Sequence, residues 1–138
     1  MKLSKAVRDA FQAAVNARNH SYSPYSRFKV GAALQVRGVA DPVGGCNVEN
    51  ASYGATICAE RTALLRAVAE HGQIRPEFLV VITGEPKATV PCALCLQMLA
   101  EFADDNLPIY LGNTKRILKS YKLRDLLPKP FRAFKADR

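Results

Sequence analysis

Hydrophobic residues recur at helical spacing near the start of the chain. Apolar side chains stand at positions 3, 6, 7, 10, 11, 14 and 15, which predicts an amphipathic helix over residues 3–19. Residues 59–71 are rich in alanine, leucine and arginine and stop before Gly72, a pattern typical of a helix with a glycine end signal. Pro91 introduces a third helix, expected over residues 92–104.

Shorter apolar runs predict the strands. Residues 78–83 form a nearly continuous apolar run, which indicates a buried central strand. Four more strands are expected at residues 28–36, 43–48, 107–111 and 116–120, the first two joined as a hairpin by a turn at 38–42. A short helix is expected at residues 123–127. A helix, a hairpin and then alternating helices and strands predict a three-layer α/β fold.

Length and composition favour one globular domain. The chain has 138 residues, of which 49% are hydrophobic, so we expect a single domain over residues 1–138 with a core of its own. There is no apolar run of about 18 residues, so no membrane span is predicted. Residues 1–8 are polar and amphipathic rather than signal-like, and we expect a cytoplasmic protein.

The formal net charge of +8 is concentrated at the C-terminal end. Residues 115–138 hold nine basic and two acidic side chains, whereas residues 38–114 hold four basic and nine acidic ones. Such a basic region suggests a nucleic-acid partner, as in an editing protein. The alternative is a solvated charged surface, which we favour because the short chain leaves little room for a strand-binding extension. We therefore expect no nucleic-acid partner.

Two cysteine motifs carry the candidate chemistry. Cys58 stands at the predicted start of one helix, and Cys92 and Cys95 at the start of another, three positions apart and so on one side of that helix. Unpaired N–H groups and the partial positive charge at helix starts stabilise thiolates, the metal-binding form of cysteine. Three such ligands predict a catalytic zinc site, because they leave the fourth tetrahedral position for water.

Glu60 and Arg61 follow the first of these cysteines. Glu60 lies two residues after Cys58, close to the metal without needing to bind it, and suits a proton shuttle. Three thiolates outweigh the charge of zinc, and Arg61 could offset the excess by donating hydrogen bonds to the sulfurs. A metal ligand, one residue, a glutamate and a later Pro-Cys-x-x-Cys is the signature of zinc deaminases.

The main alternative is a structural zinc site with a fourth protein ligand. Cys46, His20 or His71 could supply that ligand, although such sites usually show two close pairs of ligands in sequence. A disulfide between Cys92 and Cys95 is a further alternative, disfavoured in an intracellular chain.

Around these motifs the chain resembles the short, homotetrameric, zinc-dependent cytidine deaminases from about residue 22 to residue 131. The resemblance rests on several separate segments, namely Tyr22-Ser23-Pro24-Tyr25-Ser26, Phe28-Lys29-Val30-Gly31-Ala32-Ala33-Leu34, Gly45-Cys46-Asn47-Val48-Glu49-Asn50-Ala51-Ser52-Tyr53, Cys58-Ala59-Glu60-Arg61-Thr62-Ala63, Pro91-Cys92, Cys95, Gln97, Leu126-Leu127-Pro128 and Phe131. It implies an α/β/α sandwich with a mixed five-stranded sheet. It also implies hydrolytic deamination of cytidine and deoxycytidine to uridine and deoxyuridine, in pyrimidine salvage.

The resemblance also assigns roles at matching positions. It implies one Zn²⁺ per subunit on the three cysteines, with a zinc-bound hydroxide as nucleophile and Glu60 as proton shuttle. Asn47 and Glu49 would read the ribose 3′-hydroxyl, and paired acceptors suit a neutral sugar. The remaining substrate contacts would be the ring of Phe28, the backbone N–H of Ala59, Ala51 and Tyr53 across a subunit boundary, and Phe131 from another neighbour.

Two departures from the family pattern lie between and after the last two cysteines. The family commonly has Gly-Ala where this chain has Ala93-Leu94, and arginine where this chain has Leu96. Loss of that cation would leave Arg61 to compensate the thiolates alone. A rival within the same superfamily is a deaminase of another aminopyrimidine such as blasticidin S, and the Asn47-x-Glu49 pair argues against it.

Overall fold

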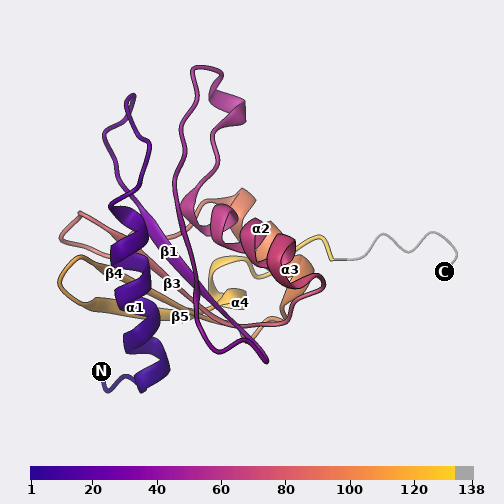
Figure 1. Cartoon of the computed structure of the whole chain (residues 1–138). Helices are drawn as coiled ribbons and strands as arrows, with labels where there is room; N and C mark the ends of the chain where they lie inside the picture. The colour runs from indigo at the N-terminus through magenta and orange to yellow at the C-terminus, as the bar shows by residue number, and fades with distance from the viewer. Residues whose placement is uncertain (133–138) are drawn as a thin grey trace, which may run out of the picture.

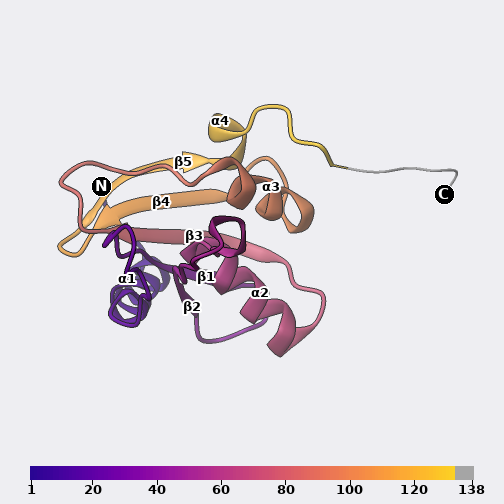
Figure 2. The same ribbon diagram turned by 90° about the horizontal axis from the view of Figure 1, so that it is seen from above.

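The computed structural model describes residues 1–132, in which one five-stranded sheet lies between two helical layers (Figures 1 and 2). The strands are β1 (Gly31–Val36), β2 (Val43–Cys46), β3 (Pro76–Thr83), β4 (Pro108–Asn113) and β5 (Ile117–Lys122). Their spatial order is β2-β1-β3-β4-β5; β3 and β4 are parallel and all other neighbours antiparallel. The predicted three-layer fold with a mixed five-stranded sheet is confirmed.

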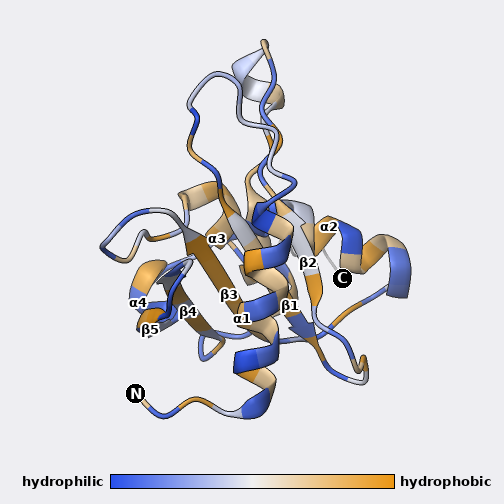
Figure 3. Cartoon of the chain, turned by 60° about the vertical axis from the view of Figure 1, so that its left-hand side comes forward, coloured by the Kyte–Doolittle hydropathy of each residue, from blue (hydrophilic) through white to orange (hydrophobic). Residues whose placement is uncertain are grey.

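The first helix covers one face of the sheet alone. Helix α1 (Lys5–Arg18) begins at Ser4, whose hydroxyl accepts a hydrogen bond from the Val7 N–H at 3.2 Å. Its apolar stripe, including Val7, Ala10 and Ala14, packs on Ala33, Val80 and Ile82 of β1 and β3. The hydrophilic face of α1 points outward (Figure 3).

The other face carries α2 (Ala59–His71), α3 (Ala93–Phe102) and the short α4 (Leu123–Leu126). Ala63 and Leu64 of α2 and Leu99 of α3 share a core with alternate residues of the same strands, Leu34 and Leu79 among them. Successive strand residues point to opposite faces, so β1 and β3 are buried on both sides. Packing of both helix starts against this core fixes the positions of the cysteines.

Most predicted elements are present within one to three residues of the expected bounds, and α2 has the predicted bounds. Strand β1 differs, because it begins at Gly31 rather than at residue 28. The Asn47 side chain donates to the Phe28 carbonyl and accepts from the Val30 N–H. Residues 28–30 are thus paired with a side chain instead of a strand. Likewise β2 ends at Cys46, before the predicted residue 48.

Two loops project together from one end of the sheet (Figure 1). One is the segment 19–30, and the other, residues 47–58, carries the 3₁₀ turn η1 (Tyr53–Ala55). Isolated bridges join Val48 to Tyr22 and to Ile57, and the rings of Tyr25 and Tyr53 meet edge to face with centroids 6.5 Å apart.

Two expectations from the sequence concern the basic C-terminal region and the absence of a membrane span. Residues 133–138, with Lys135 and Arg138 of the basic C-terminal region, lie outside the described part. Within residues 1–132 no helix combines the length and apolarity needed to cross a membrane.

Candidate metal centre and active site

The starts of α2 and α3 present two cysteines in the same backbone geometry. Cys58 is the N-cap of α2, with φ −71° and ψ 157°, and Cys92 is the N-cap of α3, with φ −70° and ψ 164°. Neither thiol caps its own helix, so both sulfurs are free to take another partner. Cys95 follows one turn into α3 and is fully buried.

The three sulfurs lie at the separations that zinc requires. Thiolates about 2.3 Å from a tetrahedral zinc stand about 3.8 Å apart. The Sγ atom of Cys58 is 3.8 Å from that of Cys92, which is 3.6 Å from that of Cys95, and all three lie within 4.8 Å of one another. The donor set therefore fits a zinc ion without rearrangement.

The charge around the sulfurs also fits a bound cation. The pKa of the Cys58 thiol is lowered to about 5, chiefly because the Cys95 thiol hydrogen-bonds to its thiolate and further because Arg61 does so. Arg61 Nη2 lies 3.9 Å from the Cys58 sulfur and 3.2 Å from the Thr56 carbonyl oxygen. Its Nε is buried and has no hydrogen-bond partner within residues 1–132, so the contacts of this cation with the Cys58 sulfur and the Thr56 carbonyl are made through Nη2.

The residues considered as a fourth protein ligand are not part of the three-cysteine cluster. Within residues 1–132 the cluster contains neither Cys46 nor His20 nor His71. Cys46 is half-buried at the end of β2, where burial raises the pKa of its thiol. All four cysteines are free, so no disulfide joins Cys92 to Cys95. Three ligands with an open fourth position is the arrangement of catalytic rather than structural zinc.

Glu60 lies beside this cluster in the first turn of α2. Its side chain is 5% exposed and lines a cavity of about 290 Å³ together with Cys58 and Cys92. Burial raises the pKa of Glu60 to about 7, against the lowering effects of a hydrogen bond with its own backbone and one with Cys95. A carboxyl group with a pKa near neutrality both takes up and releases protons readily.

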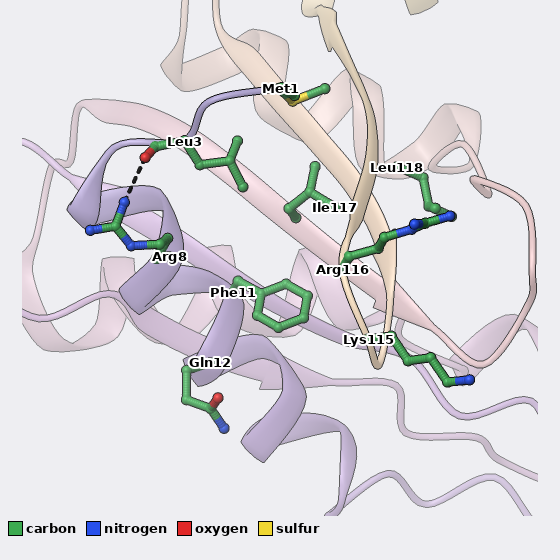
Figure 4. Close-up of a pocket in the computed structure, with 9 residues that line it drawn as sticks. All are labelled: Met1, Leu3, Arg8, Phe11, Gln12, Lys115, Arg116, Ile117 and Leu118. Atoms are coloured by element: carbon green, nitrogen blue, oxygen red, sulfur yellow. Dashed lines mark hydrogen bonds between the residues drawn. The ribbon is translucent and has the colours of Figure 1, made fainter.

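Most of the sequence-predicted site residues line this same cavity. They are Phe28, Asn47, Glu49, Cys58, Ala59, Glu60 and Cys92, with Cys95 buried behind them. A larger cavity of about 670 Å³ lies between α1 and β5 and includes Phe11, Lys115 and Ile117 (Figure 4). Its lining contains no cysteine and no carboxylate, so the smaller cavity is the candidate active site.

Asn47 is buried and nearly saturated with hydrogen bonds. Its Oδ1 accepts from the Val30 N–H at 3.0 Å and from the Ser21 hydroxyl, and its Nδ2 donates to the Phe28 carbonyl at 2.7 Å. One Nδ2 hydrogen is left over. The expectation that Asn47 offers an acceptor to a sugar is therefore wrong, because its acceptor oxygen is used within the protein; what it can offer is a donor.

Glu49 keeps acceptor capacity and is held as an anion. Its Oε1 accepts from the N–H groups of Tyr25 and Ser26 at 2.9 and 3.1 Å, and its Oε2 accepts from the Ser26 hydroxyl. The Ser26 hydroxyl is the main reason that the pKa of Glu49 is lowered. Oε1 accepts two hydrogen bonds and Oε2 accepts one, so Oε2 keeps a lone pair for a ligand. Asn47 and Glu49 thus form a donor and acceptor pair.

Three predicted substrate contacts lie outside the cavity. Ala51 and Tyr53 belong to the projecting loop, where the Tyr53 side chain is 81% exposed. Phe131 is 66% exposed, and both its backbone N–H and its carbonyl are bonded to the Gln97 amide of α3. None of the three lines the cavity of its own chain.

Several cavity residues escaped the sequence analysis. They are Ser26, Val30, Thr56, Val81, Thr83, Thr89 and Val90. Thr83 closes β3, and the carboxyl end of a parallel strand is a usual position for ligand contacts, a signal that could have found it. The pairing of Ser26 with Glu49 gives no sequence signal, because the two residues are 23 positions apart.

The residues that depart from the family pattern occupy two environments. Leu94 is exposed, whereas Leu96 is 5% exposed and belongs to the core beneath α2 and α3. Within residues 1–132, Arg61 is the cation that lies within hydrogen-bond distance of a cysteine sulfur. Leu96 therefore makes hydrophobic contacts in the core at a position where the family pattern has arginine.

Comparisons with known proteins agree on one protein family. The family model of the cytidine and deoxycytidylate deaminase zinc-binding region matches residues 4–111. A cytidine deaminase of Halalkalibacterium halodurans is 41% identical over 120 residues, covering 87% of this chain and 89% of that protein. One from Mycobacterium tuberculosis is 41% identical over 123 residues, covering 89% and 84%.

Solved structures agree with the sequence comparison. The cytidine deaminase of Burkholderia pseudomallei superimposes with a TM-score of 0.81 at 37% identity and covers 94% of this chain and 100% of that one. The cytidine deaminase of Mycobacterium tuberculosis gives a TM-score of 0.77 at 36% identity and covers 91% and 96%.

Proposed function

The chain belongs to the cytidine and deoxycytidylate deaminase family, a family of zinc-dependent hydrolases, and from this we propose that it deaminates free cytidine and deoxycytidine. One observation carries the proposal: two thiols of a three-cysteine cluster, a buried carboxyl group, and a donor and acceptor pair line a single cavity. The reaction adds water to the substrate and releases ammonia, giving uridine or deoxyuridine. We assign it to pyrimidine salvage in the cytoplasm.

Cys58, Cys92 and Cys95 would hold the metal. Zinc bound there supplies Lewis-acid activation of a water molecule at the open coordination position. Glu60 would accept a proton from the attacking water and deliver it to ring atom N3. It would then accept a second proton from the new C4 hydroxyl and pass it to the amino group, which leaves as ammonia. Arg61 holds negative charge on the Cys58 sulfur and so keeps this ligand deprotonated.

The base and the sugar are read by different groups. Phe28 supplies an aromatic face for the pyrimidine, and the backbone N–H of Ala59 lies at the start of α2 beside Glu60. The leftover Nδ2 hydrogen of Asn47 donates to the ribose 3′-hydroxyl oxygen, whose proton is accepted by Glu49. A hydroxyl that is both donor and acceptor matches this pair, and a phosphate, which has no such proton to give at neutral pH, would be repelled by Glu49.

We further propose a homotetramer in which neighbouring subunits complete each cavity. Support comes from large apolar side chains exposed on the projecting loop and around α3, namely Val48, Tyr53, Val90, Leu94 and Phe131. Apolar surface of this kind commonly marks a protein interface. Ala51, Tyr53 and Phe131 then reach the substrate of a neighbour, and light scattering of the purified protein should give four times the mass of the chain.

The experiment that tests the function is ammonia release from cytidine by purified, zinc-loaded protein, with uridine identified as product. A chelator-treated sample is the control and should release ammonia at no more than the uncatalysed rate. Blasticidin S and single-stranded RNA, offered in the same assay, should be poor substrates. If zinc-loaded, folded protein left cytidine unchanged and deaminated one of these instead, the assignment would be wrong.

A further inference from the structure

The turn at residues 23–27 is wrapped around the carboxylate of Glu49. Two consecutive backbone N–H groups, of Tyr25 and Ser26, donate to Oε1, and the Ser26 hydroxyl donates to Oε2. Both carboxylate oxygens are therefore held by one short segment. Glu49 lies outside any strand, so these bonds take the place of a sheet ladder in fixing its direction.

The Ser26 hydroxyl is itself oriented by a third group. The Phe28 N–H donates to Ser26 Oγ at 3.0 Å, which leaves the single hydroxyl proton to point at Glu49. Phe28, Ser26 and Glu49 thus form a continuous chain of hydrogen bonds. This chain joins the backbone of the residue beneath the base to the carboxylate assigned to the sugar.

The backbone of the turn shows how closely it is specified. Arg27, between Ser26 and Phe28, has a φ of 58°, in the left-handed region that a non-glycine residue rarely adopts. Its N–H is bonded to the Ser23 carbonyl at 2.9 Å. A conformation of this kind persists only where surrounding contacts hold it. The contacts here are the hydrogen bonds to Glu49 on one side and those to Asn47 on the other.

We propose that Ser26 is a positioning residue that fixes the Glu49 carboxylate for the ribose 3′-hydroxyl, an inference that rests on the proposed function. Ser26 lines the cavity, but its proton is committed to Glu49 and its oxygen accepts from Phe28. It acts through Glu49 rather than on the substrate. A hydrogen bond to a charged group is worth more than one between neutral groups, so its loss should be measurable at an exposed site.

The test compares the variant Ser26→Ala with wild type on two substrates, cytidine and 3′-deoxycytidine. Removal of the hydroxyl should raise the KM for cytidine about tenfold and change kcat less than twofold. The KM for 3′-deoxycytidine, which lacks the group that Glu49 reads, should change less than twofold. The variant Ser26→Thr keeps a hydroxyl and should restore the KM for cytidine to within about threefold of wild type.

Controls separate this role from a structural one. Ser120→Ala, on the exposed outer strand β5, removes the same atom far from the cavity and should leave both KM values unchanged. Zinc content and the unfolding midpoint should be equal in all variants. An unchanged KM for cytidine, or an equal rise for both substrates, would overturn the role of Ser26 alone. Wild type without activity on cytidine would overturn the proposed function and this inference together.

Discussion

The two halves of the candidate site are supported in different ways. The proposed metal ligands and proton shuttle stand at the starts of α2 and α3, where Ala59, Glu60 and Cys95 are buried against the core. Asn47 and Glu49, which we propose bind the sugar, lie on segments without regular structure and are held by side-chain hydrogen bonds. Close packing fixes the first half, and a polar network fixes the second.

The two halves of the site should therefore be sensitive to different kinds of substitution. Packed helix starts tolerate loss of a surface bond but not a change in volume, because interiors relax only in part. A network of hydrogen bonds tolerates small changes in shape but not the exchange of a donor for an acceptor. Substitutions in each half should therefore change different quantities, zinc binding and stability in the first and the KM for cytidine in the second.

The largest effect is expected from Glu60→Gln. The amide has the same shape but cannot move protons, so kcat should fall about 10²–10⁴-fold while the KM for cytidine changes little. Zinc per chain, measured by atomic emission, should equal the wild-type value because Glu60 is not among the three proposed ligands. A zinc-loaded variant with near-normal turnover would contradict the assigned role.

Gly45→Ala tests the packed half without touching a reacting group. A Cβ at this position would meet the Ala59 carbonyl oxygen at 2.8 Å and approach the Ala63 nitrogen more closely still, which pushes the start of α2 away from β2. We expect a loss of about 1–3 kcal/mol in the free energy of unfolding. Zinc affinity should also fall about 10–100-fold, because the displaced helix start carries Cys58.

Gly44→Ala is the matched control for this change. A Cβ there would meet the Ala17 Cβ at 3.4 Å and the Ala13 carbonyl oxygen at 3.6 Å, so only a slight adjustment is needed. Zinc titration and thermal unfolding of both variants give the comparison. Equal effects of the two alanines would mean that contact with α2 does not position the metal ligands.

Asn47→Asp tests the polar half. The carboxylate keeps an acceptor for Val30 and Ser21 but replaces the donor with an oxygen that faces the Phe28 carbonyl. We expect the KM for cytidine to rise about 10–50-fold, consistent with an unpaired buried polar group, while zinc content stays constant. The KM and the metal content are measured on the same sample.

Asn113→Asp is its control. This asparagine only accepts, from the N–H groups of Lys115 and Arg116 in the turn between β4 and β5, and an aspartate can do the same. Its KM should match wild type. If Asn47→Asp lost zinc instead of affinity for cytidine, the two halves of the site would not be separable in the way described.

The smallest effect is expected from Gln97→Ala. The Gln97 amide holds both backbone groups of Phe131, so its removal frees a ring that we propose closes over a neighbour's substrate. The KM for cytidine should rise about threefold, the equivalent of less than 1 kcal/mol. Gln12→Ala, which removes an exposed amide bonded only to Asn16, should have no effect on the KM. Equal KM values for Gln97→Ala and Gln12→Ala would contradict a role of Phe131 in substrate binding.

The sequence was most informative where periodic patterns and local spacing decide the structure. The bounds of α2 follow from its composition and from Gly72, and the approach of Cys58 to Cys92 follows from their equivalent places at helix starts. The limits appeared at the loops. Residues 28–30 have the composition of a strand, and only the competing Asn47 side chain removes them from it.

Polar networks between distant segments gave no sequence signal. The pairing of Ser26 with Glu49, and of Ser21 with Asn47, joins positions more than 20 residues apart, and serine is common in any loop. Whether Asn47 offers a donor or an acceptor depended on which of its atoms the protein already uses. Such choices depend on geometry that composition and periodicity do not encode.

We propose that deamination takes place at a zinc ion held by three thiolates, with its fourth coordination position open to water or substrate. X-ray absorption at the zinc edge of the purified protein counts the sulfur ligands directly. We expect three sulfurs at about 2.3 Å and one oxygen or nitrogen neighbour that changes when a pyrimidine nucleoside inhibitor is added. Four sulfur ligands, or a coordination shell unchanged by the inhibitor, would instead identify a closed structural zinc site without a catalytic role.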